Sequence, residues 1–533
     1  MTGWTGQTST RLGSSEQPQA APPTLALQGK LKTIAELGEI AGRARSEGRA
    51  TVLCHGVFDL FHVGHVRHLK AARREGDLLI VTLTADKHVN KGPGRPVFTE
   101  RLRAEMIAAL EFVDFVGIND APSAEPVLNA VRPRVYVKGS DYKQPEDDVT
   151  GGIVAEKNVV ESHGGKIVFT EDITFSSSEL INKHLDIYEP TLAQHLERMR
   201  ADRALDRLLG LIDRIKDYRV TIVGDTIIDE YQYVVPMGKS AKENMIATLY
   251  RDREVFAGGV IAAANHLASF CKSVEILTCL GSDDPHEELL RNCLRENVTL
   301  TAIKRPGSPT TRKCRFVDTD YSMRKLFEVY HMNDQPLAPA LQAEFDNLIA
   351  ERATSADVTV VTDFGHGLIS RSSIATLGKS KFLSVNAQSN SANYGFNLIT
   401  KYPRADYICL DGPEARLAIG DKFVDPLTIA AQTLPQLVEC PRLVVTQGKH
   451  GCFAYDRSNG IIHVPALTNT IVDTVGAGDA FFAVSSLFAA ADAAMEDIAF
   501  VGNAAGAMKV GIVGHRSSVE RTAFIKYLTA ILK

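Results

Sequence analysis

The chain has 533 residues, of which 44% are hydrophobic and 23% charged, and its formal net charge is −5. This length predicts two domains, and the weakly negative charge argues against a broad basic surface for nucleic acid. The eight cysteines contain no C-x-x-C pair, which disfavours a zinc site or a disulfide framework and favours a reducing, cytoplasmic location.

The first segment, residues 1–30, is expected to be a disordered tail. It is polar, rich in Ser, Thr, Gly, Gln and Pro, and lacks the apolar core of a signal peptide. No apolar run in the chain reaches the length of a transmembrane helix, so no membrane contact is expected.

Residues 31–190 alternate between helix-like and strand-like segments. A helical pattern in "LKTIAELGEIAGRARSEG" is followed by the apolar strands "ATVLCHG" and "DLLIVTLTAD", the helix "RLRAEMIAALEFV" and three further strands, "DFVGIND", "VYVKGSD" and "GKIVFTED". Strands that alternate with helices predict a parallel α/β sheet.

The segment 191–216 is charged and amphipathic, and it predicts a helical linker. A second α/β domain is expected over 217–533, where strands such as "YRVTIVGDTIID", "DVTVVTDFGHG" and "RLVVTQG" recur. A cut near residue 200 is therefore expected to give two pieces that fold independently. No short-period repeat is visible, which argues against solenoids and propellers.

The stretch "GVFDLFHVGH" places His62 and His65 where a strand ends and a helix begins. A helix N-terminus favours anions, and two imidazoles beside it can donate hydrogen bonds to phosphate. Gly64 lets a phosphate approach the backbone closely. A zinc pair would need further ligands, and neither His55 nor His68 has a suitable spacing. A structural role remains the alternative for any single histidine.

This lead-in, with "RPVFTERLRAEMIAAL", "VKGSDY" and "FSSSELINK" in that order, resembles the cytidylyltransferase-like nucleotidyltransferases over residues 50–185. The resemblance implies a Rossmann-like domain with His62 and His65 as catalytic residues. It implies nucleotide binding by Gly56, Phe58, Gly64, Lys91, Arg103, Ser176, Ser177 and Ser178, and acceptor binding by Lys138 and Asp141. The alternatives are helix capping for the serines, a polar turn for the acceptor residues, and solvated surface charge for the other cations.

The reaction implied is attack by a phosphate monoester on the α-phosphorus of ATP or CTP, with loss of pyrophosphate and with Mg²⁺ on the triphosphate. The string "VKGSDY" resembles heptose-1-phosphate adenylyltransferases more than glycerol-phosphate ones. The stretch "TEDITFSSS" is acidic where the latter carry an arginine. A sugar 1-phosphate acceptor is favoured, and the base stays open.

The string "DTVGAGDAFFA" (473–483) is the strongest single motif. Gly476 and Gly478 leave room for backbone N–H groups to face a phosphate, and the following helix directs its dipole there. Asp479 then lies where an acceptor hydroxyl would sit, as a general base. A simple helix-start turn is the alternative for an isolated G-x-G.

This string resembles the ribokinase-like (PfkB) carbohydrate kinases, and the resemblance covers residues 217–533. It implies a ribokinase-like α/β fold with a phosphate site at Gly476, Ala477 and Gly478, nucleotide contacts at Thr446 and Gly448, a sugar site at Asp229, Gly258 and Gly259, and Mg²⁺ at Glu414, directly or through water. Four positions depart from the family pattern: Ala262 and Asp411, each in place of Asn, Asn386 in place of Asp, and His366 in place of Lys.

A sugar kinase joined to a nucleotidyltransferase resembles the bifunctional enzymes of ADP-heptose synthesis, in which the two parts have the opposite order. Sugar phosphates and nucleotides are the expected ligands, and a homodimer is expected by analogy alone. Two alternatives stay open. One is a cytidylyltransferase for a polyol or unusual sugar phosphate. The other is a kinase half that only senses a sugar phosphate.

Overall fold

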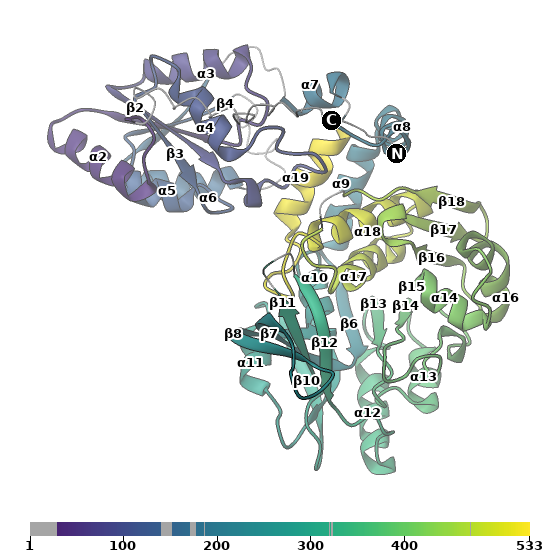
Figure 1. The fold of residues 1–533 in the computed structure, drawn as a ribbon. Helices are drawn as coiled ribbons and strands as arrows, with labels where there is room; N and C mark the ends of the chain where they lie inside the picture. The colour runs from purple at the N-terminus through teal and green to yellow at the C-terminus, as the bar shows by residue number, and fades with distance from the viewer. Residues whose placement is uncertain are drawn as a thin grey trace, which may run out of the picture. The chain divides into compact units, whose positions relative to one another are not determined.

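The fold is a computed structural model that describes residues 29–139, 152–170, 177–185, 187–318, 320, 323–468 and 471–533. The chain forms two compact units (Figure 1). Unit 1 contains the described residues of 29–88, 98–139 and 155–170, and unit 2 contains the others. Almost all of the predicted tail lies outside the described residues, as do Asp141 and Ser176. Within the described ranges, no helix is long and apolar enough to span a bilayer.

A five-stranded parallel sheet forms the centre of unit 1, with strand order β3-β2-β1-β4-β5. The strands are β1 (Thr51–Gly56), β2 (Leu78–Thr84), β3 (Phe115–Asn119), β4 (Val135–Gly139) and β5 (Lys166–Thr170). The Val, Ile and Leu runs of β1 and β2 are buried, as a parallel sheet covered by helices on both faces requires.

Helices cover both faces of this sheet. One face packs against α3 (Val63–Arg73) and α4 (Glu100–Ala108), and the other against α2 (Ile34–Ser46), α5 (Glu125–Val131) and α6 (Gly152–Ser162). The strand order reverses between β1 and β4. Open α/β sheets bind ligands in the crevice at such a reversal, and β1 leads there through residues 57–62 into α3.

Unit 2 contains a nine-stranded sheet with strand order β10-β9-β6-β13-β14-β15-β16-β17-β18. It is parallel from β10 to β16, and β17 and β18 are antiparallel. The strands are β6 (Arg219–Gly224), β9 (Ser273–Gly281), β10 (Val298–Arg305), β13 (Val358–Asp363), β14 (Leu383–Ala387), β15 (Tyr407–Asp411), β16 (Arg442–Thr446), β17 (Cys452–Asp456) and β18 (Gly460–Val464).

Two apolar cores lie on the two faces of this sheet. The larger one contains side chains of α8 (Pro190–Ala201), α9 (Ala204–Ile215), α10 (Val260–Ala268), α17 (Ala477–Ala490), α18 (Met495–Lys509) and α19 (Arg521–Leu532). The other contains side chains of α12 (Pro339–Arg352), α13 (Arg371–Leu377), α14 (Gly412–Ile419) and α16 (Leu434–Leu437). The shorter α7 (Ser177–His184), α11 (Glu287–Asn292) and α15 (Pro426–Thr428) complete the α-helices among the described residues.

A separate four-stranded sheet of unit 2 has the order β12-β11-β7-β8 (Figure 1). Its strands are β7 (Thr226–Lys239), β8 (Ile246–Gly259), β11 (Arg312–Asp318) and β12 (Arg324–His331). β7 follows β6 after a single residue, and β8 leads directly into α10. The four-stranded sheet is therefore joined to the main sheet through β7, which follows the end of β6, and through β8, which precedes α10.

The helices α8 and α9 occupy the predicted linker, and their apolar faces are part of the larger core. Six of their large side chains are at most 3% exposed: Leu192, Leu196, Met199, Leu208, Ile212 and Ile215. α19 lies beside both helices (Figure 1). A cut near residue 200 would fall inside α8 and divide this core.

A piece that begins at residue 187 is therefore expected to fold, whereas one that begins at residue 217 is not. Burial of a large apolar side chain stabilises by about 1.5–3 kcal/mol, so six amount to roughly 9–18 kcal/mol. That exceeds or matches the whole stability of a typical domain. Calorimetry of the two pieces, which differ only in α8 and α9, measures the effect. Equal, cooperative melting of both would show that the two helices are dispensable.

Two candidate active sites

The histidine pair of unit 1 forms a reciprocal cap at the start of α3. His62 is the residue before the helix, and its Nδ1 accepts the N–H of Gly64 at 3.0 Å. The N–H of His62 in turn donates to Nδ1 of His65 at 3.3 Å, and the two rings stack with centroids 4.0 Å apart. The sequence pattern thus builds a capping box from two imidazoles in place of Ser and Glu.

This cap fixes the tautomer of both rings. Because Nδ1 of each neutral imidazole accepts a backbone N–H, its proton must lie on Nε2. Both Nε2 atoms are therefore donors, next to a helix N-terminus that itself favours anions. The prediction that His62 and His65 handle phosphate has a physical basis in this geometry.

The residues before the pair hold the His65 ring in place. Phe58 has a φ of +51°, and its ring meets that of His65 edge-on at a centroid distance of 5.3 Å. Phe61 stacks on the same imidazole at 5.4 Å. A Cβ at Gly56 would be in van der Waals contact with the Phe58 ring, at 3.4 Å, so Gly56 lies directly beside this ring. Gly56 and Phe58 thus support His65 in the structure, and their nucleotide contacts stay predictions.

Arg103 is fully buried, which the surface-charge alternative did not anticipate. Its guanidinium donates to the carbonyls of Phe98 and Thr84, each at 3.0 Å, and to Val57 O, and it pairs with the Asp86 carboxylate. These contacts tie together the ends of β1 and β2. The predicted contact between Arg103 and a triphosphate would require part of this network to open.

The predicted acceptor residue Lys138 lies at the end of β4 and forms an ion pair with Glu156 of α6, at 2.7 Å. Tyr136 donates to the same carboxylate at 3.1 Å. Lys138 is nearly buried, so any acceptor role would involve exchange of this partner.

The other predicted triphosphate ligands, Lys91, Ser177 and Ser178, belong to unit 2. Sequence reasoning missed Arg95, which opens the quoted "RPVFTERLRAEMIAAL". Its guanidinium donates to the Ser178 hydroxyl at 2.9 Å and to Asn182 Oδ1 at 2.6 Å. The amide of Asn182 then donates to Ala530 O in α19 at 3.0 Å. The serine helix α7 is thereby anchored to α19.

The second candidate site lies at the start of α17. Gly476 precedes the helix with a φ of +77°, and a Cβ there would lie 2.6 Å from the His515 ring, so glycine is required. Asp479 lies in the first turn and is buried, and burial raises its pKa. Gln388 donates to Asp479 Oδ1 at 2.8 Å. A desolvated, oriented carboxylate at a helix N-terminus suits a general base near a phosphate.

The predicted sugar residue Asp229 lies on β7 and is held by two basic side chains. It pairs with Arg315 of β11 and with His515, whose Nε2 is 3.3 Å from Asp229 Oδ2. Burial alone would raise the pKa of Asp229, but Arg315 and His515 together hold it below its ordinary value. A Cβ at Gly258 would overlap Asp229 Oδ2, at 1.9 Å, and Gly259 has a φ of +57°. The glycine pair therefore makes room for the aspartate.

The departures from the family pattern have separate structural settings. Asn386 lies in β14 and donates to Cys409 O at 2.7 Å, so it links β14 to β15. Ala262 is buried in α10. Burial and the nearby Lys313 lower the pKa of His366 to about 3, so this imidazole is neutral. The residue that replaces the family lysine thus carries no charge.

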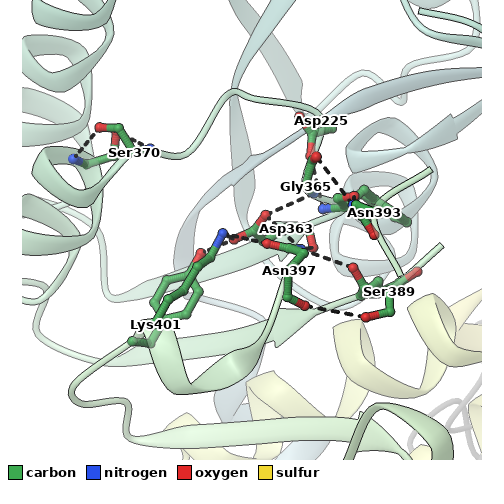
Figure 2. Close-up of polar contacts among 12 residues, drawn as sticks. Asp225, Asp363, Gly365, Ser370, Ser389, Asn393, Asn397 and Lys401 are labelled. Carbon is green, nitrogen blue, oxygen red and sulfur yellow. Dashed lines mark hydrogen bonds and ion pairs between the residues drawn. The ribbon is translucent and has the colours of Figure 1, made fainter. Parts of the chain in front are cut away.

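The turn that contains His366 rests on a buried acidic network that sequence reasoning did not single out. Figure 2 shows Asp363 next to Asn397, whose Nδ2 lies 3.2 Å from Asp363 Oδ1, and next to Lys401, with which it forms an ion pair. Asp225 accepts the N–H of Phe364 at 2.9 Å. Burial and the Asp363 carboxylate raise the pKa of Asp225 to about 7. Asp363, Asn397 and Lys401, together with Gly365 and Asn393, line a cavity of about 170 Å³.

Glu414 and Asp411 form a capping box at the start of α14. Glu414 Oε2 accepts the N–H of Asp411 at 3.0 Å, and Oε1 accepts the N–H of Ser389 at 3.1 Å. Burial and the Asp411 carboxylate raise the pKa of Glu414 to about 8. Two crowded carboxylates favour an added cation, and hard oxygen donors suit Mg²⁺. No group of three or more metal-ligating side chains occurs among the described residues, so a metal here would keep water ligands.

The predicted nucleotide residues lie at the end of β16. The Thr446 hydroxyl donates to Leu410 O at 3.4 Å, and Gly448 opens a short turn with a φ of +54°. Their contact with a nucleotide stays a prediction.

Comparison with models of protein families gives two matches, in the order predicted from the motifs. Residues 218–522 match the pfkB family carbohydrate kinases, and residues 53–183 match the cytidylyltransferase-like proteins. The family predicted for each part of the chain is thereby confirmed.

Similar proteins include the bifunctional protein HldE of Trichlorobacter lovleyi, 41% identical over 165 residues, which are 30% of this chain and 32% of that protein. HldE of Methylobacillus flagellatus is 45% identical over 142 residues, 26% of this chain and 28% of that protein. The chain thus aligns with about a third of the length of these relatives. Ribokinase from Thermotoga maritima aligns with a TM-score of 0.46 at 19% identity, over 58% of this chain and 99% of the ribokinase.

Proposed function

The chain belongs to the pfkB family of carbohydrate kinases, and on this premise we propose that it is a bifunctional enzyme of nucleotide-sugar synthesis. One activity phosphorylates a sugar or sugar phosphate with ATP. The other transfers a nucleotidyl group from ATP or CTP to a sugar 1-phosphate and releases pyrophosphate. The observation that supports the proposal is the presence of two helix starts whose geometry suits a phosphate, one with two imidazole donors and one with a buried carboxylate.

For the kinase, Asp479 would take the proton of the acceptor hydroxyl as its oxygen attacks the γ-phosphorus and ADP leaves. The raised pKa of Asp479 makes it a stronger base than a solvated aspartate, and Gln388 holds its orientation. When bound, Mg²⁺ would neutralise charge on the triphosphate, and Glu414 and Asp411 are the donors that fit it. Backbone N–H groups at the start of α17 would hold the phosphates.

For the transferase, a phosphate oxygen of the acceptor would attack the α-phosphorus, and the bond to pyrophosphate would break. The Nε2–H groups of His62 and His65 would donate to the oxygens on which charge accumulates. No covalent enzyme intermediate is needed, so positioning and charge neutralisation supply the catalysis. The resemblance of "VKGSDY" to heptose-1-phosphate adenylyltransferases supports a sugar 1-phosphate acceptor.

Mass spectrometry of the full chain with ATP or CTP and a panel of sugars, sugar phosphates and sugar 1-phosphates tests the proposal. A phosphorylated sugar is the expected kinase product, and a nucleoside diphosphate sugar with pyrophosphate is the expected transferase product. The absence of both products across the panel would refute the bifunctional assignment.

A second candidate, in which unit 2 only senses a sugar phosphate, is favoured by one observation. The sugar-site carboxylate of Asp229 is already paired with Arg315 and His515. Under this alternative, sugar phosphates would bind unit 2 and change the rate of nucleotidyl transfer, and no ATP would be consumed without a sugar 1-phosphate. Kinase turnover in the same panel would exclude it.

A further inference from the structure

Lys509 is a fully buried lysine whose ammonium group is surrounded by main-chain carbonyls. It is the last residue of α18. Its Nζ donates to Val475 O at 2.9 Å, Gly514 O at 2.6 Å and Ile512 O at 3.5 Å. Within the described part of the chain, Lys509 forms no ion pair with a carboxylate. Its ammonium group donates its hydrogen bonds to carbonyl dipoles, as for a cation in a site lined by backbone oxygens.

The three carbonyls come from two loops that meet beside the start of α17. One loop, which includes Val475, leads into α17, and the other, which includes Gly514, follows α18. The Asp473 carboxylate links the same two loops through their N–H groups. It accepts the N–H of Gly514 at 2.8 Å and the N–H of Val475 at 3.2 Å. Lys509 holds their carbonyls, and Asp473 holds their N–H groups.

The contact with Val475 O orients the next N–H group. The C=O of Val475 and the N–H of Gly476 belong to one planar trans peptide, so they point in opposite directions. With the carbonyl directed at Lys509, the Gly476 N–H must face away from it. A Cβ at Gly476 would lie 3.2 Å from Lys509 Cε, so the side chain also packs directly on this glycine. Asp479 follows three residues later in the same helix start.

Lys509 keeps its charge at neutral pH. Burial lowers the pKa of Lys509 to about 8, and the nearby acidic groups Asp473, Asp479 and Asp229 act in the opposite direction. His515 and Lys325 are the further titratable groups at this position. His515 pairs with Asp229, and Lys325 donates to Asp473 at 2.9 Å.

We propose that the Lys509 ammonium serves as a built-in monovalent cation that holds the phosphate-binding start of α17 in its working conformation. This assigns Lys509 as a positioning residue for the kinase, and it rests on the proposed kinase function. The nitrogen-to-oxygen distances of 2.6–2.9 Å to the two nearest carbonyls are similar to those at which carbonyl oxygens hold K⁺ or NH₄⁺. A cavity left by a shortened side chain should therefore accept either ion.

The test uses the full chain with Lys509→Ala, in buffers of equal ionic strength that contain K⁺, NH₄⁺ or the bulky tetramethylammonium ion. We expect the kinase rate of the variant to fall about 10²-fold in tetramethylammonium and to recover at least about tenfold in K⁺ or NH₄⁺. The melting temperature of the variant should rise by about 2–4 °C in K⁺, because an ion that binds only the folded state stabilises it. The parental protein should show neither response.

Two further variants make the result specific. Lys509→Met fills the space without a charge, so it should be as slow as the alanine variant and should not respond to any cation. It also provides the test if Lys509→Ala does not fold. Lys272→Met, at an exposed lysine of the same unit, should behave as the parental protein.

Parental kinase rates in Lys509→Ala or Lys509→Met would overturn the proposal. So would a folded alanine variant whose melting and rate are the same in K⁺ and in tetramethylammonium, because the lysine would then be only a packing element. If the parental chain phosphorylates no sugar, the kinase function fails. The melting temperature of Lys509→Ala in K⁺ and in tetramethylammonium then still decides whether the carbonyls of Val475, Ile512 and Gly514 bind a monovalent cation.

Discussion

Asp479→Asn is expected to lower the kinase rate by about 10²–10⁴-fold, the range typical for loss of a general base, while ATP still binds. The amide has the size of the carboxylate, and Gln388 can still contact its oxygen, so the fold of α17 should persist. The phosphates are assigned to backbone N–H groups around Gly476 and Gly478, which the change does not touch. Calorimetry of ATP binding and a coupled phosphorylation assay on one preparation measure the two effects.

Asp492→Asn is a matched control, because it makes the same change at an exposed aspartate just beyond the other end of α17. It should leave the kinase rate within a factor of about two, as expected for a surface substitution. Parental activity of Asp479→Asn would show that Asp479 is not the base. Loss of ATP binding in that variant would instead place the carboxylate on the metal–nucleotide complex and make the assigned role wrong.

His65→Ala is expected to slow nucleotidyl transfer by about 10²–10³-fold and to leave the kinase unchanged. The substitution removes the Nε2–H donor, and it also removes the Nδ1 acceptor for the His62 N–H at the helix cap. His65→Gln keeps a side-chain acceptor and an N–H donor on a more mobile group, so it should retain more activity than the alanine variant. Pyrophosphate release with ATP or CTP is the measurement.

His163→Ala, at an exposed histidine of unit 1, is the control for a general effect of losing an imidazole. Near-parental pyrophosphate release by His65→Ala would contradict the assignment of the pair. A decrease in both activities by the same factor would point to misfolding, and the melting temperature of each variant distinguishes that case.

The elements that carry local patterns could be predicted from the sequence. The apolar run before Gly56 forms β1, and the D-T-V-G-A-G-D string forms a turn at Gly476 followed by α17, because both depend on neighbours within a few residues. The amphipathic helices before residue 217 could also be expected. Their burial in the core of unit 2 could not, because their apolar faces show only that some partner exists.

The unpredicted features depend on contacts between distant segments. The contact of Arg103 with a phosphate stays a prediction, and its guanidinium hydrogen-bonds carbonyls at the ends of two strands of unit 1, which its sequence position does not indicate. Lys509 lies in an apolar helix, and its partners are backbone carbonyls of two separate loops. Every residue has such a carbonyl, so no residue type in the sequence indicates these contacts. The pairing of Asp229 with Arg315 depends on the register of β7 and β11. Such placements follow from tertiary structure rather than from local spacing.

The anchor of the serine helix α7 on α19 has a consequence for synthesis on the ribosome. Asn182 and its partner Ala530 are separated by 348 residues. At roughly 5–20 residues per second, the ribosome needs about 20–70 s to produce the second after the first. Most of unit 1 can fold as it emerges, but α7 reaches its final packing only when α19 has left the exit tunnel. The packing of α7 is therefore completed only after α19, the last helix of unit 2, has been synthesised.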